Sequence, residues 1–110
     1  MKPRKLNIKT IPAADINRAY RFWRDVFDLP QSGHQSGRHL VIDGEDIVFV
    51  TGKPTDRLEM LVRDHQADLV KHLRNNFIPI IGEPEKRFGN KIALSIHDSE
   101  DNLIVLEANV

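Results

Sequence analysis

The stretch that decides the fold is Asp98-Ser99-Glu100-Asp101-Asn102-Leu103-Ile104-Val105-Leu106-Glu107, near the end of the 110-residue chain. Five polar residues, which favour a turn, lead directly into a mainly apolar run. Side chains of a β-strand alternate between its two faces. We therefore expect Ile104 and Leu106 to pack in the core. The opposite face then carries Leu103, Val105 and Glu107.

The composition limits the class of protein. A chain of this length forms one domain with its own core. Sixteen Lys and Arg balance 16 Asp and Glu, so the net charge favours neither nucleic acid nor an anionic membrane as a partner. The absence of cysteine excludes disulfides and thiolate metal sites. No apolar run of the length of a signal peptide follows the basic start, so we expect a cytoplasmic protein.

The first half of the chain predicts a strand and an amphipathic helix. Residues 6–11 alternate in polarity, and Pro12-Ala13-Ala14 ends this strand. Asp15 is a candidate N-cap, because its carboxylate can accept from the free amides of a first helical turn. The helix is predicted to run to about Asp28. Its apolar stripe comprises Ile16, Ala19, Tyr20, Trp23, Val26 and Phe27.

A hairpin is predicted next, with strands over residues 38–42 and 47–50. Asp43-Gly44 tolerates the positive φ of the tight turn between them. The polar segment 31–37 before the hairpin is a loop or a weak strand. Residues 52–56 contain glycine and proline and are the best candidate for a linker.

The second half repeats this order. A strand over 57–63 leads to Asp64, a predicted N-cap, and to a helix that runs to about Phe77. The apolar stripe of this helix comprises Leu69, Val70, Leu73 and Phe77. Strands are predicted over residues 78–81, 91–96 and 103–107. The charged segment 82–89 is either a solvated loop or a flap over a pocket.

These elements predict a single domain, 1–110, built from two similar modules of about residues 4–52 and 56–110. Both modules read as strand, helix and further strands, with a period of about 50 residues. Helices and strands mix without strict alternation, which is typical of the α+β class.

Three segments, in this order, resemble signatures of the vicinal oxygen chelate superfamily, which includes glyoxalases, bleomycin-resistance proteins and ring-cleaving dioxygenases. Its opening helix is similar to Asp15-Ile16-Asn17-Arg18-Ala19-Tyr20-Arg21-Phe22-Trp23-Arg24-Asp25-Val26-Phe27-Asp28-Leu29. Its mid-chain strand is similar to Arg57-Leu58-Glu59-Met60-Leu61-Val62-Arg63-Asp64. Its closing strand, an Asp-Pro-Asp-Gly-Asn turn followed by apolar residues and a glutamate, is similar to residues 98–107. The resemblance implies two βαβββ modules in an open, incomplete barrel that holds a ligand on its concave side.

The resemblance also implies a divalent metal held by two histidines and the closing glutamate. The matching positions here carry Asn7 or Ile8, then Arg57, then Val105. Metals of this kind need converging imidazole or carboxylate lone pairs. Arginine supplies only donors and a fixed positive charge, and valine supplies nothing. We therefore expect no metal and no other cofactor.

Strand alternation predicts which side chains face the concave side. The packed face is expected to carry Leu6, Ile8, Leu58, Met60 and Val62. In the hairpin, one face is expected to carry Leu40, Ile42, Ile47 and Phe49. The predicted ligand-binding residues are Asn7, Lys9, His39, Val48, Arg57, Glu59, Leu103, Val105 and Glu107.

Several of these side chains have a second interpretation. Arg57 either pairs with Glu59 or binds an anionic or carbonyl group of a ligand. Glu107 either orients a ligand or is a solvated charge at the rim. His39 is either part of the wall or a surface histidine.

The remaining histidines and the aromatic pair have simpler interpretations. His34, His65 and His72 match no metal-binding spacing and are predicted to be solvated. His97 precedes a carboxylate, but neighbours in a strand point to opposite faces, which disfavours a paired base. Phe22 and Trp23 are predicted to pack in the core.

The sequence favours a metal-free binding protein that holds a partly apolar organic molecule, in the manner of the bleomycin-resistance branch, and that forms a homodimer. The alternative is a glyoxalase- or dioxygenase-like metalloenzyme with displaced ligands. His39, Glu59, Glu107 and His97 would then supply the donors. A third hypothesis is a subunit that binds another protein through its open sheet.

Overall fold

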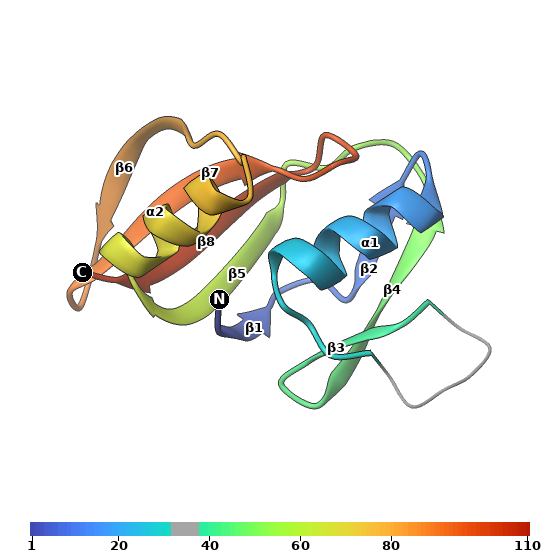
Figure 1. The fold of residues 1–110 in the computed structure, drawn as a ribbon, viewed down its shortest axis with the longest axis horizontal. Coiled ribbons are helices and arrows are strands. Elements are labelled where there is room, and N and C mark those ends of the chain that lie inside the picture. Colours follow the sequence, from blue (N-terminus) through green and yellow to red (C-terminus); the bar gives the residue numbers. More distant parts are fainter. Residues whose placement is uncertain (32–37) are drawn as a thin grey trace.

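The computed structural model describes residues 1–31 and 38–110. His34 and most of the predicted loop 31–37 therefore lie outside the described residues. Within the described residues, two helices and two open sheets form a mixed α+β fold, as the sequence predicted (Figure 1). The sheets do not close into a barrel. The helices are α1 (Ile16–Val26) and α2 (Gln66–Asn75).

The larger sheet has five strands in the order β1-β5-β8-β7-β6. Their bounds are β1 (Pro3–Leu6), β5 (Leu58–His65), β8 (Leu103–Asn109), β7 (Lys91–His97) and β6 (Ile81–Arg87). The smaller sheet has the order β2-β4-β3. Its bounds are β2 (Thr10–Ala13), β4 (Glu45–Thr51) and β3 (Leu40–Ile42). Helix α1 packs on the smaller sheet and α2 on the larger one (Figure 1).

Helix α1 forms as the sequence predicts. Asp15 is its N-cap, and the carboxylate accepts from the backbone amide of Arg18. The apolar stripe buries Trp23 completely, with its ring 4.9 Å from that of Phe27 and 6.0 Å from that of Phe49. Edge-to-face contacts of this kind add stability to the apolar burial. The stripe therefore fixes α1 against β4.

The predicted start of α2 is wrong. The N-cap is His65, because β5 continues as far as that residue. Asp64 instead accepts from the backbone amide of Lys2 at 2.7 Å, which ties the start of the chain to β5. The helix ends at Asn75, two residues before the approximate end predicted, and Phe77, predicted in its apolar stripe, is instead 91% exposed. His72, predicted to be solvated, is half-buried and contacts the carbonyl of Val26 at the end of α1.

The opening strand is two strands rather than one. β1 pairs with β5 in the larger sheet, whereas β2 pairs in parallel with β4 in the smaller sheet. Pro12 is accommodated in β2 because an edge strand needs fewer backbone donors. Residues 7–9 therefore cross from one sheet to the other.

The segment predicted as a loop or flap is mostly a strand. β6 runs to Arg87 and forms a hairpin with β7 through a turn at Phe88-Gly89-Asn90. It is the exposed edge of the larger sheet, and its charges and Pro84 protect such an edge from further pairing. The mistake has a plain cause, because β6 has no buried face to give it an alternating pattern.

The turn before β8 contains a buried polar cluster. Asp98 is 6% exposed and accepts four hydrogen bonds. One carboxylate oxygen accepts from the backbone amides of Glu100 and Asn102, and the other accepts from the indole of Trp23 and the side-chain amide of Asn102. The Asn102 amide also donates to the carbonyl of Pro12 in β2. This cluster joins the turn to α1 and the smaller sheet.

Glu100 makes a second connection from the same turn. Its carboxylate accepts from the backbone amide of Asp15 and from the guanidinium of Arg18 at 2.8 and 3.0 Å. The hydrogen bond from Arg18, with those from Asp15 and Ser99, lowers the pKa of Glu100 to about 2, although burial opposes this shift. The turn 98–102 thus connects β8 of the larger sheet to α1 and to β2 of the smaller sheet.

Candidate functional site

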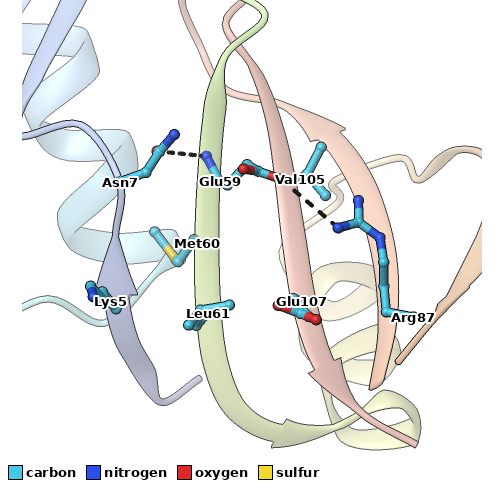
Figure 2. A pocket seen from close by; sticks show the side chains of 8 residues that line it. All are labelled: Lys5, Asn7, Glu59, Met60, Leu61, Arg87, Val105 and Glu107. Carbon is cyan, nitrogen blue, oxygen red and sulfur yellow. Dashed lines mark hydrogen bonds and ion pairs between the residues drawn. The ribbon is translucent and has the colours of Figure 1, made fainter. Parts of the chain in front are cut away.

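A cavity of about 310 Å³ lies on the face of the larger sheet opposite α2 (Figure 2). Its position follows from strand alternation. Leu58, Ile104 and Leu106 are buried on the helix side, whereas their neighbours Glu59, Val105 and Glu107 face the cavity. The lining residues are Lys5, Asn7, Glu59, Met60, Leu61, Arg87, Val105 and Glu107.

The cross-strand register orders these side chains. Lys5 of β1 pairs with Leu61 of β5, which pairs with Glu107 of β8. In the next row, Glu59 pairs with Val105. Leu61 and Val105 are half-buried and form the apolar part of the floor.

Four of the nine residues predicted to bind a ligand line this cavity: Asn7, Glu59, Val105 and Glu107. The other five lie elsewhere. Lys9 forms an ion pair with Glu45 at 3.3 Å and contacts the carbonyl of Leu6. Leu103 begins β8, where its amide donates to Thr55. Arg57 is exposed in the segment before β5.

Val48 belongs to the smaller sheet, and His39 directly precedes β3 of that sheet. Val48 is a half-buried residue of β4, and the ring of His39 lies 3.6 Å from the carboxylate of Asp46. Both are on the predicted face, but that face belongs to the smaller sheet. Alternation predicts the face of a strand, and it carries no information about which of two sheets the strand joins.

Asn7 has a structural role in the wall. Its side-chain oxygen accepts from the amide of Glu59, and its side-chain nitrogen donates to the carbonyl of Arg57, both at 2.8 Å. Asn7 therefore extends the pairing of β1 and β5 beyond Leu6. Its amide is engaged by the backbone rather than free for a ligand.

Arg87 is the cavity residue that the sequence reasoning missed. It is the last residue of β6, and its guanidinium reaches toward Val105 and Glu59 (Figure 2). The ion pair between Arg87 and Glu59 measures 4.0 Å, as does that with Glu85, which is too long for a hydrogen bond. The Nε atom of Arg87 is buried and has no hydrogen-bond partner among the described residues.

The predicted ion pair between Arg57 and Glu59 does not form, because Glu59 faces Arg87 instead. The carboxylate of Glu107 has neither a hydrogen bond nor an ion pair within residues 1–31 and 38–110. Two cations, Lys5 and Arg87, and two anions, Glu59 and Glu107, line the cavity, so its formal charges cancel.

The cavity does not fit the metal that the resemblance implies. Of its residues, only Glu59 and Glu107 offer carboxylates, and the amide of Asn7 is already engaged. In the described part of the chain, no three His, Asp or Glu side chains gather closely enough to hold an ion. The guanidinium of Arg87 would repel a cation beside it.

His97, considered as a donor in the metalloenzyme alternative, is exposed at the end of β7. Asp98 points the other way and binds Trp23. As alternation suggested, the two side chains form no pair. Neither described helix is long and apolar enough to cross a membrane.

The fold is shared with several solved structures. An integron cassette protein from V. cholerae superimposes with a TM-score of 0.75 at 20% identity, over 100% of this chain and 98% of that one. A lactoylglutathione lyase from Agrobacterium tumefaciens gives 0.69 at 14% identity, over 90% and 89%. The fosfomycin resistance protein FosX from Listeria monocytogenes, complexed with Mn(II) and sulfate, gives 0.68 at 14% identity, over 92% and 86%.

No family model matches the chain, and no curated protein matches its sequence. The structural likeness shows that the chain has the glyoxalase/bleomycin-resistance fold, which the three sequence signatures predicted. At these identities the likeness concerns the fold, and the chemistry has to be argued from the cavity itself.

Proposed function

We propose that this protein binds a small, partly apolar organic molecule in the cavity of the larger sheet, using its own side chains and no metal ion. The cavity volume of about 310 Å³ lies at the lower end of the range for small-molecule sites, about 300–1,000 Å³. Such sites combine an apolar wall with a few polar groups that orient the ligand. Leu61 and Val105 supply the first property, and Arg87 and Glu107 supply the second.

The observation that carries this proposal is the unpaired Nε of Arg87. A buried donor without an acceptor costs roughly 1–3 kcal/mol. An acceptor on a ligand that reached this nitrogen would remove that cost. Burial of the ligand against Leu61 and Val105 adds about 25 cal/mol per Å² of apolar surface.

The metalloenzyme alternative has less support. The FosX structure contains Mn(II), and lactoylglutathione lyase is named for a lyase reaction, so this fold accommodates catalysis in other chains. Here, however, Val105 and Arg87 line the cavity. Neither side chain offers a lone pair that could coordinate a metal ion. We therefore favour binding through side chains over metal-assisted chemistry.

Val105→Phe is expected to weaken binding about tenfold or more, because the larger ring fills the floor of the cavity. The measurement is a screen of a charge-diverse fragment library by two-dimensional ¹H–¹⁵N NMR in the presence of EDTA. Ligands should shift the amide signals of Leu61, Val105 and Arg87.

The matched control is Val48→Phe, which makes the same change at a half-buried strand residue of the smaller sheet. This variant should bind as the parent protein does. If no fragment shifts the cavity amides, or if Val48→Phe impairs binding as much as Val105→Phe, the proposed site is wrong.

A further inference from the structure

The charges of the cavity are arranged as two separate anchors. Arg87 extends from β6 over β7 and places its guanidinium beside Val105 (Figure 2). Glu107 follows Val105 by two residues on the same strand and the same face. Two residues of a β-strand span about 7 Å. A positive and a negative group thus face the same space at roughly that separation.

Each anchor lacks a close partner in the free protein. Arg87 Nε has no acceptor, and both of its ion pairs are 4.0 Å long. Glu107 is half-buried, and its carboxylate has no cation or donor within hydrogen-bond distance in the described part of the chain. Hydrogen bonds that involve a charged group are stronger than those between neutral groups. Arg87 and Glu107 therefore each favour a ligand group of opposite charge.

A ligand with a single charge would satisfy only one anchor. An anion at Arg87 would also approach the carboxylates of Glu59 and Glu107, and a cation at Glu107 would approach Arg87 and Lys5. A molecule that carries both charges meets complementary charge at each end. The apolar floor of Leu61 and Val105 then suits an aliphatic segment between the two ends.

We infer that the cavity takes a zwitterionic ligand, with an anionic group at Arg87, a cationic amine at Glu107 and an apolar segment along Val105. This inference rests on the proposed function and specifies its ligand class. It assigns Arg87 and Glu107 as the residues that determine specificity.

The test compares four probes with the same carbon skeleton: 5-aminopentanoate, pentanoate, pentylamine and pentanol. Each is titrated into the isotope-labelled protein, and the amide shifts of Leu61, Val105 and Arg87 give the dissociation constant. We expect 5-aminopentanoate to bind about tenfold more tightly than any other probe, which corresponds to about 1.4 kcal/mol.

Two variants assign the ends of the ligand. Arg87→Gln should reduce the affinity for 5-aminopentanoate to that for pentylamine, whereas Glu107→Gln should reduce it to that for pentanoate. Arg21→Gln on α1 and Asp68→Asn on α2 are matched charge-removing controls at exposed positions, and they should leave all four affinities unchanged. The amide spectra of the unliganded variants confirm that each one is folded.

The inference is overturned if pentanoate, pentylamine or pentanol binds as tightly as 5-aminopentanoate, or if none of the four shifts the cavity amides. The fragment screen separates this failure from failure of the proposed function. If fragments with a single charge or no charge bind in the cavity, the proposed binding function stands, and the inference of a zwitterionic ligand is wrong. The absence of any cavity ligand would remove both.

Discussion

Asp98→Asn is expected to lower the free energy of unfolding by roughly 2–6 kcal/mol. The carboxylate accepts four buried hydrogen bonds, two at each oxygen. Asparagine keeps one oxygen and replaces the other with an amide that faces two donors. Those two donors then lose their acceptors, at roughly 1–3 kcal/mol each. Domains of this size have only about 5–15 kcal/mol of stability, so the loss is large.

Urea unfolding followed by Trp23 fluorescence measures this effect, because the indole is itself one of the four donors. Asp101→Asn is the matched control, since it makes the same chemical change three residues later at an exposed side chain. The φ of Asp101 is 64°, a conformation that asparagine also tolerates. If the two variants differ by less than about 1 kcal/mol, the cluster does not hold the modules together as described.

Acid should destabilise the protein through Glu100. Its pKa is about 2 in the folded protein, against an ordinary value of 4.5. Because the folded pKa is the lower one, the folded state binds fewer protons, and the stabilisation is fully present well above pH 4.5. It decreases as the pH falls below 4.5 and is lost by about pH 2. The expected loss is on the order of 2 kcal/mol, since solvent around the half-exposed Arg18 screens the pair.

Urea unfolding at a series of pH values between 6 and 2 measures this dependence. Glu100→Gln should be less stable than the parent at pH 6, and its stability should change less between pH 4.5 and pH 2. Glu83→Gln, at an exposed position of β6, serves as the matched control and should keep the parent profile. A Glu100→Gln profile as steep as that of the parent would show that another group governs the acid sensitivity.

Much of the fold could be predicted because periodicity reports burial. The stripe that includes Ala19 and Trp23 and the alternation at Leu58, Met60 and Ile104 all place the expected side chains in the core. The Asp-Gly turn also forms, with positive φ at both Asp43 and Gly44. These features depend on local sequence, so a single chain suffices to find them.

What could not be predicted depends on contacts between distant segments. Asp64 has the residue type of an N-cap, but it binds the backbone of Lys2, just before β1, a contact that the sequence did not reveal. β6 was missed because a solvated edge strand has no buried face. Its last residue, Arg87, therefore had no signal to place it in the cavity. Lys9 and Val48 were misplaced because the crossing of the chain between sheets leaves no periodic pattern.

The stretch from residue 98 to residue 107 consists of two parts with different roles, the turn 98–102 and the strand that follows it. Asp98, Glu100 and Asn102 are used to bind α1, β2 and the linker, so their role is structural. The strand that follows carries Val105 and Glu107, which face the cavity. The same ten residues thus connect the two sheets and supply part of the cavity wall.

The most direct test of binding without a metal is the metal content of the purified protein after equilibration with Mn²⁺, Zn²⁺, Ni²⁺ or Fe²⁺. Gel filtration removes free ions, and elemental analysis gives ions per chain, with Glu107→Gln as the paired variant. Our account predicts far less than one ion per chain in both proteins, together with ligand binding that EDTA does not change. One ion per chain in the parent protein, lost in Glu107→Gln, would contradict it.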